Sequence, residues 1–227
     1  MDILLTASFW AALGSIILAN VLLSGDNAVV IAMAARGLPP GQQKKAIVFG
    51  SGAAIAMRIV LTLVAVRMLG LPWLKLVGGV ALLWVGAKLM SDEENEHTHP
   101  SGALGIGAAI RTILLADLVM SLDNVLAVAA AAQGNTLLLV VGLAVSIPLI
   151  VFGSTLILKV MERFPVIITA GAALLGWLAG EMMLTDPAIH RWFVEVPESA
   201  VRIAGAVGAA CVVIVGKLLQ QRAKSRV

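Results

Sequence analysis

Long apolar runs recur along the whole chain of 227 residues, separated by short polar or basic segments. A helix needs about 20 mainly apolar residues to cross the hydrocarbon core of a bilayer. Lipid offers no hydrogen-bond partners to the backbone, so uninterrupted runs of this length must be helical. Only 13% of the residues are charged, against roughly 25% in soluble domains. The sequence therefore predicts an all-α, polytopic membrane protein that forms a single membrane domain over residues 1–227.

Seven membrane-spanning helices are predicted from these runs. We expect them at 8–34, 46–68, 72–90, 103–131, 136–158, 165–184 and 200–219. The first run has no basic segment before it and no cleavage signal after it, so we expect it to remain as a span. Lys and Arg residues concentrate on one side of the predicted membrane, which indicates an outside N-terminus and a cytoplasmic C-terminus.

The chain also carries an internal repeat of polar residues. A shift of 97 residues superposes Asn20, Ser24, Asp26 and Asn27 on Asp117, Ser121, Asp123 and Asn124. Further along, Lys88 corresponds to Glu181, and these two side chains could pair. A duplication retained only for packing would not need to repeat four polar residues, so the repeat indicates function.

Each copy of the repeat contains three spans, an odd number, so the second copy must enter the membrane from the opposite side. We expect a first three-helix repeat over 8–90, a polar cytoplasmic linker over 91–101, an inverted repeat over 103–184 and an additional seventh helix over 200–219. Many secondary transporters are built from such repeats, and their binding site lies at the repeat interface near the middle of the membrane.

The repeated segments place three carboxylates, Asp26, Asp117 and Asp123, inside apolar spans. A charged residue there costs about 2.5–3.5 kcal/mol on insertion scales and normally faces the bundle interior, on an ion or proton pathway. The neighbouring amides and hydroxyls complete an all-oxygen set, which suits Mn²⁺, Mg²⁺ or Ca²⁺. The predicted metal ligands are Asp26, Asn27, Asp117, Asp123, Asn124, Asn20, Ser24 and Ser121. Alternatively, protonated Asp side chains could serve only helix association.

Local backbone geometry and two basic residues bear on this predicted site. Unwinding at Ser24 and Gly25 would turn Asp26 toward the other ligands, whereas Leu122 in the second copy predicts a milder break or none. Arg58 and Arg111 also lie within spans. Either could neutralise an Asp or line the cation's path, although for Arg111 bonding to backbone carbonyls or snorkelling is the simpler expectation.

At these motifs the sequence resembles the TerC family of integral membrane proteins, most closely its short YjbE-type branch. The segments that carry the resemblance are Asn20-Val-Leu-Leu-Ser-Gly-Asp-Asn27 and Asp117-Leu-Val-Met-Ser-Leu-Asp-Asn124. The family is grouped with the LysE-like exporters, so the resemblance implies efflux of divalent metal, chiefly Mn²⁺, from a bacterial inner membrane. The family name reflects an older link to tellurite resistance.

Several further expectations follow. Carboxylates clustered without a cation would hold protons, so metal/proton exchange is a hypothesis. No tightly bound cofactor, nucleic-acid partner or enzymatic activity is expected. An intramembrane aspartyl protease, the enzyme considered, would carry Gly-x-Gly-Asp where this chain has Leu-Ser-Gly-Asp. The partners are the lipid bilayer and the metal ion, and the oligomeric state stays open. The alternative function is a non-transporting scaffold in envelope or tellurite stress.

Overall fold

The computed structural model describes residues 10, 13–14, 17–18, 25–68, 72–98, 105–132, 136–190 and 196–224, with backbone alone at 63–68, 92–98, 123–132, 136, 138, 190 and 223–224. Throughout these residues the regular structure is helical. The helices are α2 (Gly25–Arg36), α3 (Pro40–Met68), α4 (Leu74–Thr98), α5 (Ile106–Ala132), α6 (Thr136–Arg163), α7 (Val166–Leu184), α8 (Pro187–His190) and α9 (Glu198–Lys224).

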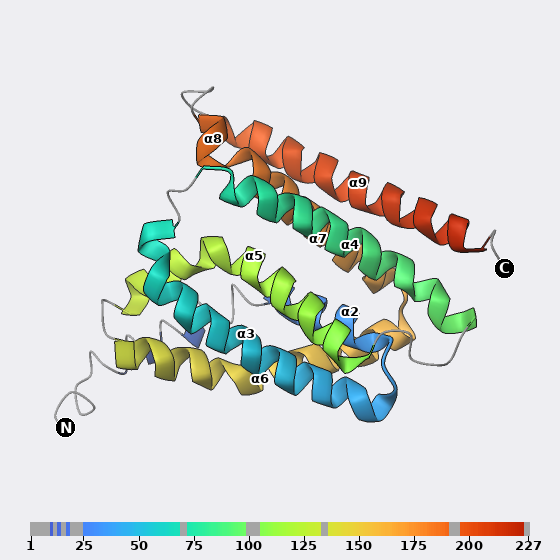
Figure 1. The fold of residues 1–227 in the computed structure, drawn as a ribbon, viewed down its shortest axis with the longest axis horizontal. Helices are drawn as coiled ribbons and strands as arrows, with labels where there is room; N and C mark the ends of the chain where they lie inside the picture. The colour runs from blue at the N-terminus through green and yellow to red at the C-terminus, as the bar shows by residue number, and fades with distance from the viewer. Residues whose placement is uncertain are drawn as a thin grey trace.

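Five segments in the described residues are long and apolar enough to cross a membrane. They are Pro40–Thr62, Leu74–Ser91, Leu139–Arg163, Val166–Ile189 and Glu198–Arg222. The 27-residue α5 lies among these helices (Figure 1), and at 1.5 Å per residue it is about 40 Å long. Of the predicted first span, the structure describes α2 and five helical positions before it. The all-helical, multi-spanning prediction is therefore confirmed, while the count of seven spans stays a prediction.

The helices extend beyond several predicted boundaries, with α3 starting six residues earlier than expected and α4 ending eight residues later. The polar segment predicted as a linker over 91–101 begins inside a helix, because the backbone of α4 continues to Thr98. Nothing between Ser91 and Thr98 breaks a helix, and the first proline comes only at Pro100. A proline disfavours the helical conformation in the residue before it, and Pro100 is the first residue after Ser91 that has this effect.

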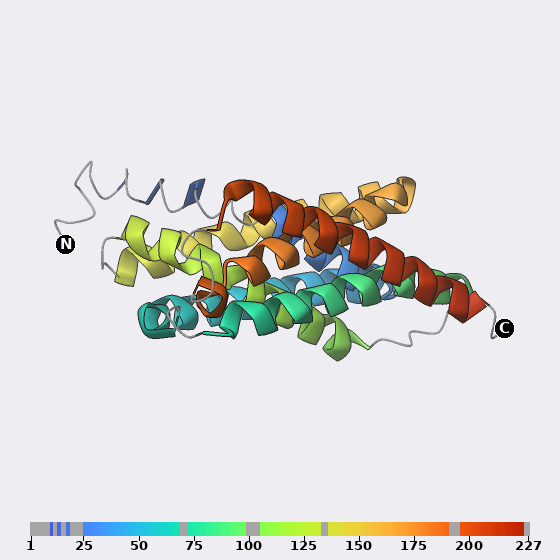
Figure 2. The same ribbon diagram turned by 90° about the horizontal axis from the view of Figure 1, so that it is seen from above.

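The helices form two packed groups (Figures 1 and 2). In the first, α2, α3, α5 and α6 contact one another in every pairwise combination. In the second, α4, α7 and α9 do the same. Contacts of α4 with α5, and of α7 with α2 and α6, join the two groups. The acidic helices α2 and α5 therefore lie together in the four-helix group.

Close approach of α7 and α9 holds the second group together. A Cβ added at Gly176 or Gly180 of α7 would collide with the backbone of α9, and one at Gly208 of α9 would collide with the backbone of α7. Small residues allow this kind of backbone contact between helices in a membrane. The glycines therefore serve helix packing.

Several helix contacts recur when the two halves are exchanged, although the contact of α6 with α7 has no equivalent of similar size between α3 and α4. The exchange pairs α2 with α5, α3 with α6 and α4 with α7, and within each pair the two helices run in opposite directions (Figure 1). The contact of α2 with α6 matches that of α5 with α3, and the contact of α2 with α7 matches that of α5 with α4. Such matching is what two inverted three-helix units would produce.

The corner between α7 and α8 is tied to the start of α4. The buried carboxylate of Asp186 accepts hydrogen bonds from the N–H groups of Trp73 (2.9 Å), Leu76 (3.0 Å) and Ala188 (2.7 Å). The first N–H groups of a helix have no partner within it, so this carboxylate caps α4 from another part of the chain. Trp73 itself has a φ of 74°, a left-handed conformation that this capping helps to hold.

Candidate functional site

The predicted ligands divide into three groups in the structure. Asp26 and Asn27 lie in the first turn of α2, and Asp117 and Ser121 lie in the middle of α5. Asp123 and Asn124 belong to α5, whose helical backbone is unbroken there, but their side chains lie outside the described part of the structure. Asn20 and Ser24 lie outside the described residues, and with them the predicted unwinding at Ser24.

A buried ion pair joins α3 to α5. Arg58 and Asp117 are 1% and 5% exposed, and an Nη2 of Arg58 lies 2.5 Å from Oδ1 of Asp117. The other carboxylate oxygen accepts a hydrogen bond of 3.2 Å from the hydroxyl of Ser121. Removing one partner of such a pair typically costs about 3–5 kcal/mol, because the remaining charge is buried alone. Arg58 therefore neutralises an Asp, the first of its two predicted roles.

Asp26 brings the other acidic segment to the same arginine. Its carboxylate is half-buried and accepts a hydrogen bond of 2.8 Å from the N–H of Asn27. It also interacts electrostatically with both Arg58 and Asp117. One carboxylate from each repeated segment therefore lies within electrostatic range of the same guanidinium, although only Asp117 forms an ion pair with it.

Beside these charges lies a buried amide without a partner. Asn27 is 2% exposed, and neither its side-chain oxygen nor its nitrogen makes a hydrogen bond to any residue the structure describes. An unsatisfied buried polar group costs about 1–3 kcal/mol. Such a group calls for an explanation, and a water molecule or an ion held in the bundle would supply the missing partner.

Sequence reasoning missed two further buried polar residues, Ser51 on α3 and Ser154 on α6. Both hydroxyls lack a hydrogen-bond partner in the described part of the chain. A signal was present in the sequence, since the segment Ile-Val-Phe-Gly-Ser occurs at both 47–51 and 150–154. Each copy ends at one of these serines.

Comparison with known proteins identifies the family of this chain. The sequence profile described as the integral membrane protein TerC family matches residues 5–225, nearly the whole chain. This protein belongs to the TerC family. The resemblance expected from the two acidic motifs is therefore confirmed.

Related proteins in bacteria share much of the chain. The uncharacterized membrane protein YjbE of Bacillus subtilis is 48% identical over 167 residues, which cover 74% of this chain and 76% of that protein. YceF, another uncharacterized membrane protein of B. subtilis, is 27% identical over 182 residues (76% and 70%). The inner membrane protein YgdQ of Escherichia coli K12, of the group named UPF0053, is 26% identical over 176 residues (69% and 73%). No solved structure matches the chain at a comparable level of significance.

The ligand chemistry of this TerC-family protein is mixed. Within the described side chains, no three His, Cys, Asp or Glu residues gather into a metal-binding cluster. Asp26 and Asp117 supply carboxylates, and the buried groups beside them are an amide and hydroxyls. Hard divalent cations accept all of these oxygens as well as water. A cation held here would therefore take part of its coordination from neutral ligands.

Two other charge interactions that the sequence left possible are not formed among the described residues. Arg111 is exposed on α5 and forms no ion pair among the described residues, so it does not neutralise the site. Lys88 does not pair with Glu181. Its Nζ instead lies 5.2 Å from the ring centre of Trp84, one turn earlier on α4. This cation–π contact lets Lys88 remain at a partly exposed position.

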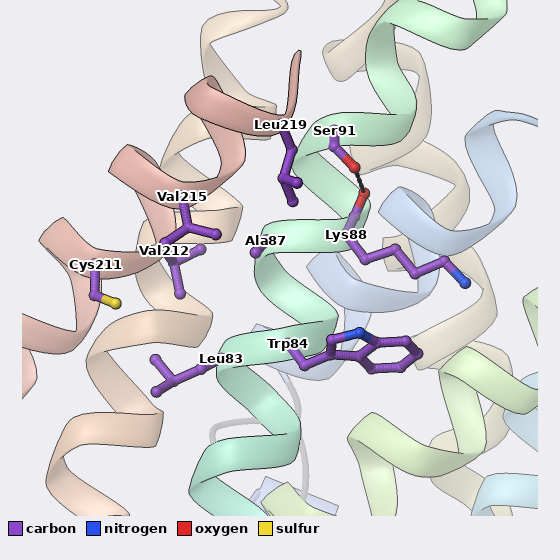
Figure 3. A pocket seen from close by; sticks show the side chains of 9 residues that line it. All are labelled: Leu83, Trp84, Ala87, Lys88, Ser91, Cys211, Val212, Val215 and Leu219. Carbon is purple, nitrogen blue, oxygen red and sulfur yellow. Dashed lines mark hydrogen bonds between the residues drawn. The ribbon is translucent and has the colours of Figure 1, made fainter. Parts of the chain in front are cut away.

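A cavity of about 310 Å³ lies between α4 and α9 (Figure 3), and no acidic residue lines it. Its lining is apolar apart from Lys88 and Ser91, and the Ser91 hydroxyl donates a hydrogen bond of 2.9 Å to the carbonyl of Lys88. Neither α4 nor α9 belongs to the four-helix group. The candidate site lies in that group instead, because Asp26, Arg58 and Asp117 are carried by α2, α3 and α5.

Proposed function

We propose that this TerC-family protein exports a divalent metal cation, Mn²⁺ above all, from the cytoplasm through a site between α2, α3, α5 and α6. The observation that carries the proposal is the buried ion pair of Arg58 with Asp117, with Asp26 of the other acidic segment within electrostatic range of both. Carboxylates buried in membrane spans ordinarily mark ion pathways. The proposed ligands also include Asn20, Ser24, Asp123 and Asn124, as the sequence predicts.

Charge balance suggests how the cation would enter. Arg58 is a tethered cation that satisfies Asp117 within the bundle. A divalent cation approaching Asp26 and Asp117 would compete with this guanidinium for the carboxylate. Part of the cation's binding free energy would then go into displacing Arg58, which keeps binding reversible, as transport requires.

The proposed transport cycle uses two inverted three-helix repeats. The opposite directions of α2 and α5, α3 and α6, and α4 and α7 support this arrangement, as does the matching of their contacts. In transporters of this type, one repeat moves against the other around a fixed site. We place the N-terminus outside and the C-terminus in the cytoplasm on the basis of the Lys and Arg distribution. No enzymatic step is proposed.

Cellular manganese content tests the proposal. A manganese-sensitive bacterial host is supplied with the wild type, Asp26→Asn, Asp117→Asn or the control Arg111→Gln, each at matched membrane abundance. We expect the wild type and the control to lower cellular manganese and permit growth at raised external Mn²⁺, and the two Asp variants to fail. Equal manganese content in all four strains would instead favour the non-transporting scaffold.

Proton coupling is tested separately in reconstituted vesicles. Cations that replace protons on the carboxylates would move in exchange for them. An imposed pH gradient should then change the rate of Mn²⁺ flux in the wild type. Flux that ignores the gradient would leave export in place but rule out proton exchange.

A further inference from the structure

The hydroxyls of Ser51 and Ser154 behave unlike the others in these helices. Ser and Thr side chains inside a helix usually donate to the carbonyl four residues earlier. Four do so here: Thr62 to Arg58, Thr112 to Ala108, Ser146 to Gly142 and Thr155 to Val151. Ser51 and Ser154 are 1% and 0% exposed, yet their hydroxyls bond to nothing in the described structure. These two oxygens are therefore left available to a ligand.

The two serines occupy the same place in two copies of one segment. In Ile-Val-Phe-Gly-Ser at 47–51 and at 150–154, the phenylalanine is exposed and the serine is buried in both copies. One copy lies on α3 and the other on α6, which contact each other. The recurrence turns both serines into the bundle and both phenylalanines toward its outer surface.

The serines and two residues of the candidate site lie at similar distances from the ends of their own helices. Ser51 comes 11 residues after the first residue of α3, and Asp117 comes 11 residues after the first residue of α5. Ser154 and Asn27 each come nine residues before the last residue of their helices. These four helix ends lie at the same end of the bundle (Figure 1). At 1.5 Å per residue, each of the four residues lies about 14–17 Å from the end of its own helix.

Neighbouring glycines bring the serine-bearing helices against the acidic ones close to these residues. A Cβ at Gly153, next to Ser154, would lie 3.9 Å from the Cβ of Ala28, the residue after Asn27. A Cβ at Gly50, next to Ser51, would meet the side chain of Ile113, one helical turn before Asp117. Thus α6 touches α2, and α3 touches α5, beside the residues of the site.

We infer that Ser51 and Ser154 are further oxygen ligands of the transported cation, acting with the amide of Asn27. The inference rests on the proposed function and extends the site to all four helices of the group. Neutral oxygens would raise the coordination number without adding negative charge, and hard cations with six or more ligands favour such sites. The two serines would thereby favour Mn²⁺, Mg²⁺ or Ca²⁺ over softer metals.

Metal binding to the purified full-length protein tests the inference. The variants are Ser51→Ala and Ser154→Ala, with Ser146→Ala as the control, because Ser146 is equally buried on α6 but its hydroxyl is bonded within its own helix. By calorimetry, we expect each test variant to bind Mn²⁺ about five- to tenfold more weakly than the wild type, the effect of one lost neutral contact. Ser146→Ala should bind Mn²⁺ as the wild type does.

Cysteine variants give a readout that a purely structural serine would not produce. A thiolate is a soft ligand, so Ser51→Cys and Ser154→Cys should bind Cd²⁺ more tightly and Mn²⁺ more weakly than the wild type, while Ser146→Cys should not. If an alanine variant fails to fold, the cysteine variants still test whether Ser51 and Ser154 bind the cation. If the wild type binds Mn²⁺ and the test variants match it for both metals, the inference is overturned while the proposed function stands. A wild type that binds no metal would overturn both.

Discussion

The guanidinium of Arg58 on α3 lies 2.5 Å from the carboxylate of Asp117 on α5, and both side chains are buried within the bundle. The two residues are 59 positions apart in the chain, and they join the first half of the protein to the second. Asp26 of the other acidic segment lies within electrostatic range of this pair, on a helix that contacts α5.

Substitution of Arg58 should destabilise the protein in a way that metal corrects. Arg58→Gln leaves Asp117 buried without its cation, a loss of about 3–5 kcal/mol. Thermal unfolding of the purified protein should show a lowered midpoint, and Mn²⁺ should raise the midpoint more in this variant than in the wild type. The control Arg111→Gln removes an exposed arginine and should change neither value. A metal-independent loss in Arg58→Gln would contradict the competition between Arg58 and the cation.

Neutralising both members of the pair should separate stability from transport. The single variant Asp117→Asn removes the carboxylate that pairs with Arg58. The double variant, which combines Arg58→Gln and Asp117→Asn, removes both charges of the pair. In a double-mutant cycle we expect the double variant to be more stable than the sum of the single losses, with a coupling of about 1–3 kcal/mol. It should still fail to transport Mn²⁺. Transport by the double variant would show that Asp117 is structural.

Asp26 should matter for binding more than for folding. It is half-buried, and its hydrogen bond goes to the adjacent N–H of Asn27. Asp26→Asn keeps an oxygen at the same place and removes only the charge. We expect Mn²⁺ affinity to fall at least about tenfold, equivalent to 1.4 kcal/mol, with an unfolding midpoint close to that of the wild type. Unchanged affinity would remove Asp26 from the site.

The cap at Asp186 should affect stability and leave the site intact. Asp186→Ala deprives three backbone N–H groups of their acceptor, and an unsatisfied buried donor costs about 1–3 kcal/mol. Asp186→Asn retains one oxygen and should lose less. Mn²⁺ affinity of the folded fraction should be unchanged in both. Equal stability of the alanine variant and the wild type would contradict the capping role.

Much of the fold could be predicted because the bilayer limits the choices. Apolar runs of sufficient length must be helices, and the observed α3, α5, α6, α7 and α9 match the predicted spans to within six residues at either end. The end of α4 could not be placed in the same way. Polar residues can continue a helix beyond the membrane, and hydropathy does not report where it stops.

The site was harder to predict because it depends on which helix faces meet. The sequence singled out Arg58 and Asp117 as charges within spans, but two arginines and three acids allowed several pairings. The serines were missed for another reason. Ser is common in helices and usually bonds to its own backbone, so only the structure distinguishes Ser51 and Ser154 from Ser146. The repeated pentapeptide was the available clue.

Manganese flux into inside-out vesicles containing the purified protein tests the central claim most directly. The wild type should accumulate Mn²⁺ in the lumen, whereas Asp26→Asn and Asp117→Asn, reconstituted at equal density and shown to be folded, should stay at the level of protein-free vesicles. The Arg111→Gln control should transport as the wild type does. Wild-type vesicles no more permeable to Mn²⁺ than protein-free vesicles, or Asp variants as active as the wild type, would contradict the account.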